Sequence, residues 1–251
     1  MSLEIDLNQA FKAISTAMVH QRGAASEDER GRRRIVIDLI KNNPELAELD
    51  IGMDRSTLLI LAARFDDVEM LQILLDQGRS NPRALDCDQY SALIFAAAAE
   101  DEAVAMRMVK ALAPHCKPES WNPKNCKDMT DVGTAILRGN VEVADFLIQT
   151  RGASADGALE LDRFGRNWLD LAVEAKPQDK AVRWVLSLPQ GKAMLRAKDS
   201  SGRSAMERAK ESGAEAAVLL MMAQEALWER EELLSATDGP SVGKSPTSLR
   251  I

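Results

Sequence analysis

Two short stretches of the sequence hold residue types that could carry out chemistry. The first, Gly239–Ser245, reads GPSVGKS, and glycine-rich loops ending in Gly-Lys-Ser cradle phosphates with their backbone N–H groups. Such a loop needs four residues between its first glycine and the Gly-Lys pair, and then a helix whose N-terminus meets the phosphate. Here there are three residues, and six more follow the motif. We interpret the match as a coincidence and expect no nucleotide site.

The second stretch contains soft metal ligands. His115, Cys116 and Cys126 lie near one another in the sequence, and zinc is commonly held by such side chains. The sequence has no C-x-x-C pair, and a fourth soft ligand could come only from His20 or Cys87. With two histidines in the chain, no Ser-His-Asp or Cys-His spacing is informative. We therefore expect ordinary loop residues here, with no catalytic residues, no metal, no cofactor and no enzyme.

The elements that would position any site come from an internal repeat. Asp162–Ala172 reads DRFGRNWLDLA, which predicts a tight turn that leads into a short helix. Related segments occur at Gly52–Ala62, Asp86–Ala96, Asn125–Ala135 and Asp199–Ala209, and their final alanines are 34, 39, 37 and 37 residues apart. A period in the thirties is typical of a stacked array of helical units.

The bulk composition favours the same architecture. The chain of 251 residues is 45% hydrophobic and only 4% aromatic, with abundant alanine and leucine, which favours helices over a β-sandwich. A net charge of −7 gives no reason to expect nucleic-acid binding. The longest apolar runs, such as Ala92–Ala99, are far below the roughly 20 residues of a membrane span. Three cysteines without regular spacing and an N-terminus unlike a signal peptide predict a soluble protein in the reducing cytoplasm.

The order of the segments predicts three regions. Residues 1–51 form an N-terminal helical cap with helices near Leu7–Val19 and Ile35–Ile40. Residues 52–234 form the array, and residues 235–251, rich in Ser, Gly and Pro, form a disordered tail. The repeats are expected at 52–85, 86–124, 125–161, 162–198 and 199–234. The fourth repeat has a longer loop around Pro177, and the last helix spans Glu215–Leu234.

An insertion lengthens the second repeat. Residues 113–125 contain Pro114, Pro118 and Pro123, which exclude a helix through the segment and predict an extended loop. In the third repeat, Gly133 falls inside the expected short helix, at a cost of about 1 kcal/mol relative to alanine. This repeat has the weakest helical signal of the five.

The turn, the Thr or Ser, the apolar helix with paired alanines and the outer helix with paired leucines resemble the ankyrin repeat. The family pattern is D-x-x-G-x-T-P-L-H-x-A-A-x-x-G, and the resemblance covers roughly Gly52–Trp228. The turn glycine remains only at Gly165 and Gly202, and no copy keeps the whole T-P-L-H core. The resemblance implies an all-α fold, an ankyrin-repeat-like α-solenoid of stacked helix-turn-helix units. Without the histidines that bond neighbouring loops in the family, we expect a softer array.

In this family the turn tips and the exposed ends of the inner helices form a concave surface that binds partners. Transferred copy by copy, these positions carry more basic than acidic side chains, together with aromatic and arginine residues of the kind enriched at interface centres. The candidate partner-binding residues are Arg64, Phe65, Tyr90, Leu137, Arg138, Arg163, Phe164, Arg166 and Arg203. Phe164, between two arginines on a turn tip, is the sharpest of these, although it could instead pack on the next turn. Trp168 and Trp184 are expected in the core, and for Trp121 the sequence favours neither the core nor the binding surface.

These features predict a non-catalytic protein-protein interaction module that binds another protein with an acidic or mixed surface. An adaptor or scaffold, an inhibitor and an effector fit the sequence equally well. Two alternatives remain open, a metal-binding or enzymatic protein that uses the 113–125 insertion, and an architectural spacer. We expect no nucleic-acid or membrane partner, and the sequence leaves the oligomeric state and the identity of the partner open.

Overall fold

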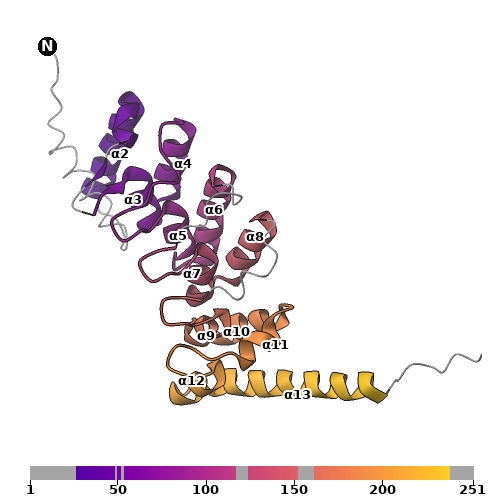
Figure 1. Ribbon diagram of the computed structural model, residues 1–251. Helices are drawn as coiled ribbons and strands as arrows, with labels where there is room; N and C mark the ends of the chain where they lie inside the picture. The colour runs from indigo at the N-terminus through magenta and orange to yellow at the C-terminus, as the bar shows by residue number, and fades with distance from the viewer. Residues whose placement is uncertain (1–26, 49, 52–53, 117–123, 152–160, 238–251) are drawn as a thin grey trace, which may run out of the picture.

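A computed structural model describes residues 27–48, 50–51, 54–116, 124–151 and 161–237 of the chain. Within these ranges, most residues lie in pairs of antiparallel helices that stack one after another (Figure 1). The pairs are α3 (Leu58–Arg64) with α4 (Val68–Asp76), α5 (Ala92–Ala97) with α6 (Glu102–Leu112), α7 (Asp131–Arg138) with α8 (Val141–Arg151), α9 (Trp168–Glu174) with α10 (Gln178–Ser187), and α12 (Ala205–Glu211) with α13 (Glu215–Thr237).

The pairs pack in two layers. The inner helices contact one another in the order α3, α5, α7, α9 and α12, and the outer helices in the order α4, α6, α8, α10 and α13. The loops between pairs project on the side of the inner helices (Figure 1). The repeated helix-turn-helix pattern therefore produces the all-α solenoid that the sequence predicts.

Each inner helix has a polar cap at its start and a small buried residue in its second half. The side-chain oxygens of Thr57, Ser91, Thr130, Asn167 and Ser204 accept the backbone N–H group three residues on, which satisfies a donor that the helix leaves free. The final alanines of the five repeats, Ala62, Ala96, Ala135, Ala172 and Ala209, have no exposed surface. Close approach of neighbouring helices requires residues of this size.

The loops that precede the inner helices share one turn. Asp86 shows the pattern, because its Oδ1 accepts the N–H groups of Asp88 at 3.0 Å and of Tyr90 at 2.7 Å. Asn125, Asp162 and Asp199 do the same in the next three repeats. At the tip one residue has a positive φ, and these residues are Arg55, Gln89, Asp128, Gly165 and Gly202. The turn thus keeps its shape even where the family's glycine is replaced.

A ladder of backbone hydrogen bonds joins each loop to the next. The N–H group of Cys87 donates to the carbonyl of Asp54 at 2.8 Å, and that of Cys126 donates to Asp88 at 2.8 Å. The N–H group of Arg163 donates to the carbonyl of Lys127 at 3.0 Å, and the ladder continues from Ser200 to Phe164, also at 3.0 Å. Backbone groups therefore connect adjacent loops although the histidines are missing.

The N-terminal end consists of α2 (Glu27–Asn42), the 3-10 helix η1 (Pro44–Glu48) and two short antiparallel strands, β1 (Asp50–Ile51) and β2 (Ser56–Thr57). In the strands, Asp50 pairs with Thr57 and Ile51 with Ser56. The helix predicted at Ile35–Ile40 begins earlier than expected, because the charged stretch before it continues the same helix. The helix predicted at Leu7–Val19 lies outside the described residues.

Other expectations need correction in detail. The insertion begins with one helical turn, η2 (Ala113–His115), because proline is tolerated in the first turn of a helix, where its missing N–H group has no intrahelical partner. The fourth repeat has an additional helix, α11 (Gly191–Arg196). The last helix continues to Thr237, three residues into the expected tail, whose remaining residues lie outside the described ranges. Trp168 is buried as predicted, and Trp184 is partly buried with its ring stacked on that of Trp168, at 6.5 Å between centroids.

Candidate protein-binding surface

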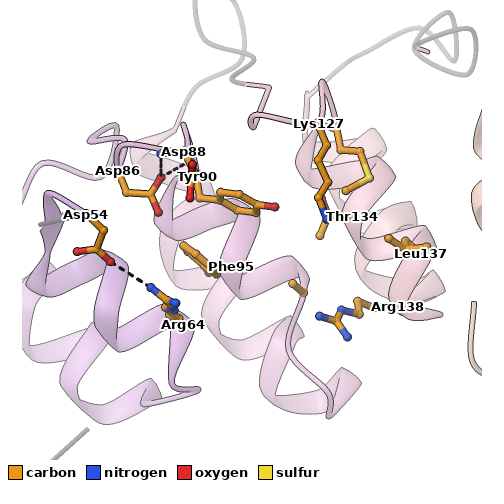
Figure 2. A pocket seen from close by; sticks show the side chains of 12 residues that line it. Asp54, Arg64, Asp86, Asp88, Tyr90, Phe95, Lys127, Thr134, Leu137 and Arg138 are labelled. Carbon is orange, nitrogen blue, oxygen red and sulfur yellow. Dashed lines mark hydrogen bonds and ion pairs between the residues drawn. The ribbon is translucent and has the colours of Figure 1, made fainter. Parts of the chain in front are cut away.

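The loops and inner helices of the first three repeats enclose a groove with a volume of about 440 Å³ (Figure 2). Its wall contains a pair of aromatic rings, Tyr90 at the base of the second loop and Phe95 on α5. The rings stack at 4.9 Å between centroids, with 24° between their planes. Both side chains are only partly buried, so they offer an apolar shelf on the groove wall.

Charged side chains surround this shelf. The guanidinium of Arg64 lies 5.6 Å from the centroid of the Phe95 ring and forms an ion pair with Asp54 at 3.2 Å. Lys127 and Arg138 line the same groove from the third repeat, and Figure 2 shows both side chains extending into it. The arrangement gives a partner both a ring surface and cations within one groove.

Two groups of the groove have shifted protonation equilibria. Burial raises the pKa of the Asp86 carboxyl, and the N–H groups of Tyr90 and Asp88 that donate to it offset part of this rise. Burial also raises the pKa of the Tyr90 hydroxyl, and the charge of Arg138 acts in the opposite direction. Since both shifts follow from burial within a turn, neither indicates acid–base chemistry.

The groove continues along the inner side of the array. Hollows of about 150 Å³ and about 600 Å³ adjoin it, and Arg138 lines all three. Glu174 and Lys176 line the 600 Å³ hollow and also the next one, of about 730 Å³, which reaches Arg203. The surface is therefore a series of connected hollows from the first repeat to the fifth. A small-molecule site, by contrast, is usually a single cleft that buries most of its ligand.

A second cluster lies on the loop of the fourth repeat. The Phe164 side chain is 45% exposed, with the guanidinium of Arg163 at 4.7 Å and that of Arg166 at 5.3 Å from its centroid. Arg166 is 12% exposed, because it forms ion pairs with Asp162 at 2.7 Å and Glu174 at 2.8 Å. Burial lowers the pKa of Arg166, but its hydrogen bonds to these carboxylates outweigh burial and raise it. Phe164 and Arg163 are thus accessible, whereas Arg166 supports the loop.

The structure brings four of the nine predicted residues together in the groove, namely Arg64, Tyr90, Leu137 and Arg138. Arg163, Phe164 and Arg166 form the separate cluster, and Arg203 lies on the fifth loop in an ion pair with Glu211 at 2.9 Å. Phe65 is placed differently, since it packs against the hydrophobic core instead of lining the groove.

Comparisons with known proteins agree with the repeat fold. The family model of the ankyrin repeat matches residues 54–87. The crystal structure of EF0377, an ankyrin-repeat protein, superposes with a TM-score of 0.61 at 18% sequence identity, over 84% of this chain and 97% of that chain. The array therefore has the fold of ankyrin-repeat proteins, and residues 54–87 also match the family in sequence. A comparison with curated proteins finds no match.

In the last two repeats, acids stand where the ankyrin pattern has histidine. Asp170 and Glu207 complete capping boxes with Asn167 and Ser204, because each carboxylate accepts the N–H group of the residue that caps its own helix. Asp170 has no exposed surface, and burial raises its pKa to about 6. The Nε of Arg208, on α12, lies 3.6 Å from its Oδ1.

Arg208 links these two repeats. Its guanidinium contacts Asp170, Glu174 and Asp199, and Glu174 in turn holds Arg166. Every carboxylate of this cluster contacts an arginine, so ion pairs connect α9 with the loop before α12 and with α12 itself. Asp170 itself is fully buried, whereas Glu174 and Arg208 line the hollow of about 730 Å³.

The possible metal ligands are dispersed. Cys116 is buried, and its Sγ contacts the carbonyl oxygen of Pro82 at 3.6 Å, while Cys126 lies exposed on the third loop. Within the described ranges, no three His, Cys, Asp or Glu residues are arranged to hold a metal ion. In the same ranges, no helix has the length and apolar character needed to cross a membrane.

Sequence reasoning missed Phe95 in the groove, and it placed Lys127 on the concave surface without including it among the nine candidate residues. Phe95 is the fourth residue of α5, at a position where the family pattern prescribes no residue type, and it lines the groove beside the stacked Tyr90 ring. Lys127 occupies a turn tip of the third repeat. It lines the same groove as Tyr90 because of the way the second and third loops are aligned.

Proposed function

We propose that this chain is a non-catalytic protein-binding module that holds an acidic or mixed protein surface along the inner side of its repeats. Ankyrin repeats are generally protein-protein interaction modules and generally non-catalytic. The observation that supports the proposal is the aromatic shelf of Tyr90 and Phe95, bordered by Arg64, Lys127 and Arg138 in a groove that continues into the next hollows.

The chemistry of the groove favours a partner with carboxylates next to an apolar side chain. The apolar residue would lie on the stacked rings, and carboxylates would pair with Lys127 and Arg138, which form no ion pair within the described residues. Aromatic and arginine side chains contribute most of the binding energy in many protein interfaces. Phe164 and Arg163 would extend this contact at the fourth loop.

An adaptor, an inhibitor and an effector all remain compatible with this surface. The proposal includes a cytoplasmic, reducing compartment, in keeping with the free state of Cys87, Cys116 and Cys126. The rival reading of an enzyme or metal protein in the insertion gains no support from the positions of Cys116 and Cys126.

Capture from a lysate of the source cell tests the proposal. The intact chain is compared with a Tyr90→Ala/Arg138→Ala variant, and mass spectrometry identifies what each retains. The matched control is Lys110→Ala/Phe146→Ala, which removes a cation that lies 5.7 Å from an aromatic ring on the outer helices α6 and α8. We expect a partner that the intact chain and the control retain and that the groove variant loses by at least about tenfold.

Equal retention by all three proteins would contradict the proposed groove. Retention of nothing by any of them would support the spacer reading. Circular dichroism checks that the variants are as helical as the intact chain, so that loss of binding is not loss of folding.

A further inference from the structure

The last helix of the array has an unusual outer face. One side of α13 packs on the array through Ala217 and Met221, which have no exposed surface. On the other side, Leu219, Met222, Leu227 and Leu233 are 66%, 54%, 52% and 69% exposed. Solenoids generally end in a unit with a polar outer face, because an apolar end would attract other surfaces. On α13 these apolar side chains are exposed beside charged ones such as Glu229 and Glu231.

The exposed side chains form a continuous stripe. Glu215, Leu219, Met222, Ala226, Arg230 and Leu233 follow one another at intervals of three or four residues, so they lie on one face of the helix. Figure 1 shows α13 as the last element of the stack, with one side against the array and its C-terminal part extending past α11. Nothing within the described residues covers the other side.

The two charged residues of the stripe suggest what covers it. Glu215 stands at the beginning and Arg230 near the end, and neither forms an ion pair with any residue that the structure describes. When two α13 helices run antiparallel about a two-fold axis between Met222 and Ala223, Glu215 of each copy lies opposite Arg230 of the other. A parallel pair would instead place arginine opposite arginine and glutamate opposite glutamate.

The side-chain sizes are complementary in the same arrangement. Leu219 of one copy lies opposite Ala226 of the second copy, and Met222 lies opposite Ala223. A large residue facing a small one allows two helices to approach closely, and a two-fold axis uses one self-complementary surface on both copies. We propose that α13 joins two copies of this chain in an antiparallel homodimer, end to end.

The geometry also limits the strength of this dimer. The overlap from Glu215 to Arg230 is 16 residues, or about 24 Å of helix at about 1.5 Å per residue. Such a contact is smaller than the roughly 800 Å² per partner of a standard interface. The dimer is therefore a weak one that forms only at high protein concentration.

Sedimentation equilibrium of the intact chain from about 5 to about 500 µM tests the proposal. We expect the apparent mass to rise from the 27.5 kDa of one chain towards twice that value. Leu219→Lys should weaken the dimer at least about tenfold. The matched control is Ile35→Lys, since Ile35 on α2 is also 66% exposed and should leave the dimer unchanged.

A charge exchange tests the antiparallel register. Glu215→Arg and Arg230→Glu should each weaken the dimer at least about fivefold, and the double variant should restore it to within about twofold. A sample that remains monomeric at about 500 µM overturns the proposal, as does a dimer that Leu219→Lys leaves intact. A double variant weaker than both single variants overturns the antiparallel arrangement. Thermal unfolding of each variant confirms that α13 stays folded.

Discussion

The substitution Asp170→Asn should make the stability of the C-terminal repeats depend less on pH. The Asp170 carboxyl is fully buried in α9, and burial raises its pKa to about 6, against about 3.9 in an unfolded chain. Its Oδ2 accepts the N–H group of Asn167 at 3.0 Å, and an asparagine oxygen can accept the same hydrogen bond. The substitution therefore removes the titrating group and leaves the helix cap in place.

The size and sign of the effect follow from linkage. Because the folded state binds this proton more tightly than the unfolded state, the group favours folding below about pH 4, and its contribution is lost as the pH rises through about 6. A difference of about two pKa values, at about 1.4 kcal/mol each, corresponds to about 3 kcal/mol. Because the unfolded group is already about half ionised at pH 4, the variant should gain about 2 kcal/mol relative to the natural chain between pH 4 and pH 7.

Urea unfolding followed by tryptophan fluorescence measures the free energy of unfolding of the C-terminal repeats. Three of the chain's four tryptophans, Trp168, Trp184 and Trp228, lie in the fourth and fifth repeats, so most of the signal reports the elements around Asp170. The quantity to plot against pH is the difference in unfolding free energy between variant and natural chain. The substitution also alters the contact with Arg208. If this adds the same amount to the free-energy difference at every pH, it does not change the slope of that difference against pH. Asp179→Asn is the matched control, because Asp179 is exposed in the same repeat.

A difference that stays constant within about 1 kcal/mol from pH 4 to pH 7 would refute the reasoning. It would mean that Arg208 stabilises the ionised Asp170 carboxylate in the folded state as much as water does in the unfolded state. A slope of the opposite sign would show that attraction by Arg208 exceeds the cost of burial.

Two further substitutions test how the loops and repeats are joined. Gly165→Ala should destabilise the protein by at least about 2 kcal/mol, because φ is +71° and the new Cβ would lie 2.8 Å from the backbone nitrogen of Ser200. Gly202→Ala, with φ of +80° and no atom within 4 Å, should cost only about 1 kcal/mol, and thermal unfolding compares the two. Asn140→Ala should cost about 2 to 4 kcal/mol in urea unfolding, because the amide donates to the buried carbonyls of Ala97 at 3.0 Å and Ala99 at 2.9 Å. An effect below about 1 kcal/mol would show that water replaces these hydrogen bonds.

The parts of the fold that repeat locally were predictable from the sequence. The alanine that ends each copy is a buried contact between helices, so its spacing reports the stacking period directly. The turn is equally local, because one Asp or Asn at its start binds two N–H groups within four residues. The start of α2 was not predictable in this way, since its first residues form a charged stretch with no apolar period.

The candidate site was less predictable because its contacts join different repeats. Arg166 reads as an exposed arginine beside an aromatic ring, yet two carboxylates bury it. One of them, Glu174, lies eight residues away at the end of α9, where no pattern of turn or helix pairs it with the loop. Phe65 and Phe95 both read as apolar residues near helix ends, and only their packing separates the core residue from the groove residue.

Neighbouring loops remain connected although the family's histidines are missing, and the way they are connected affects how the binding surface can vary. Backbone bonds such as that from Cys126 to Asp88 hold neighbouring loops in register without any side chain. Turn-tip side chains such as Lys127 and Arg163 are therefore free to vary without loss of the loop geometry. Because backbone hydrogen bonds hold the loops in place, substitutions at these turn-tip residues alone can change which partner the surface binds.

The groove and the α13 stripe lie on separate surfaces, so the two proposals are compatible. The groove is lined from Asp54 to Arg203 by loops and inner helices, whereas the stripe faces away from the array at its last helix. A two-fold pair through α13 would thus present two copies of the groove at once. A partner with repeated acidic segments would then bind the pair more tightly than a single chain, because the second contact forms within the same complex. Leu219→Lys would remove this gain and leave the affinity of each single groove unchanged.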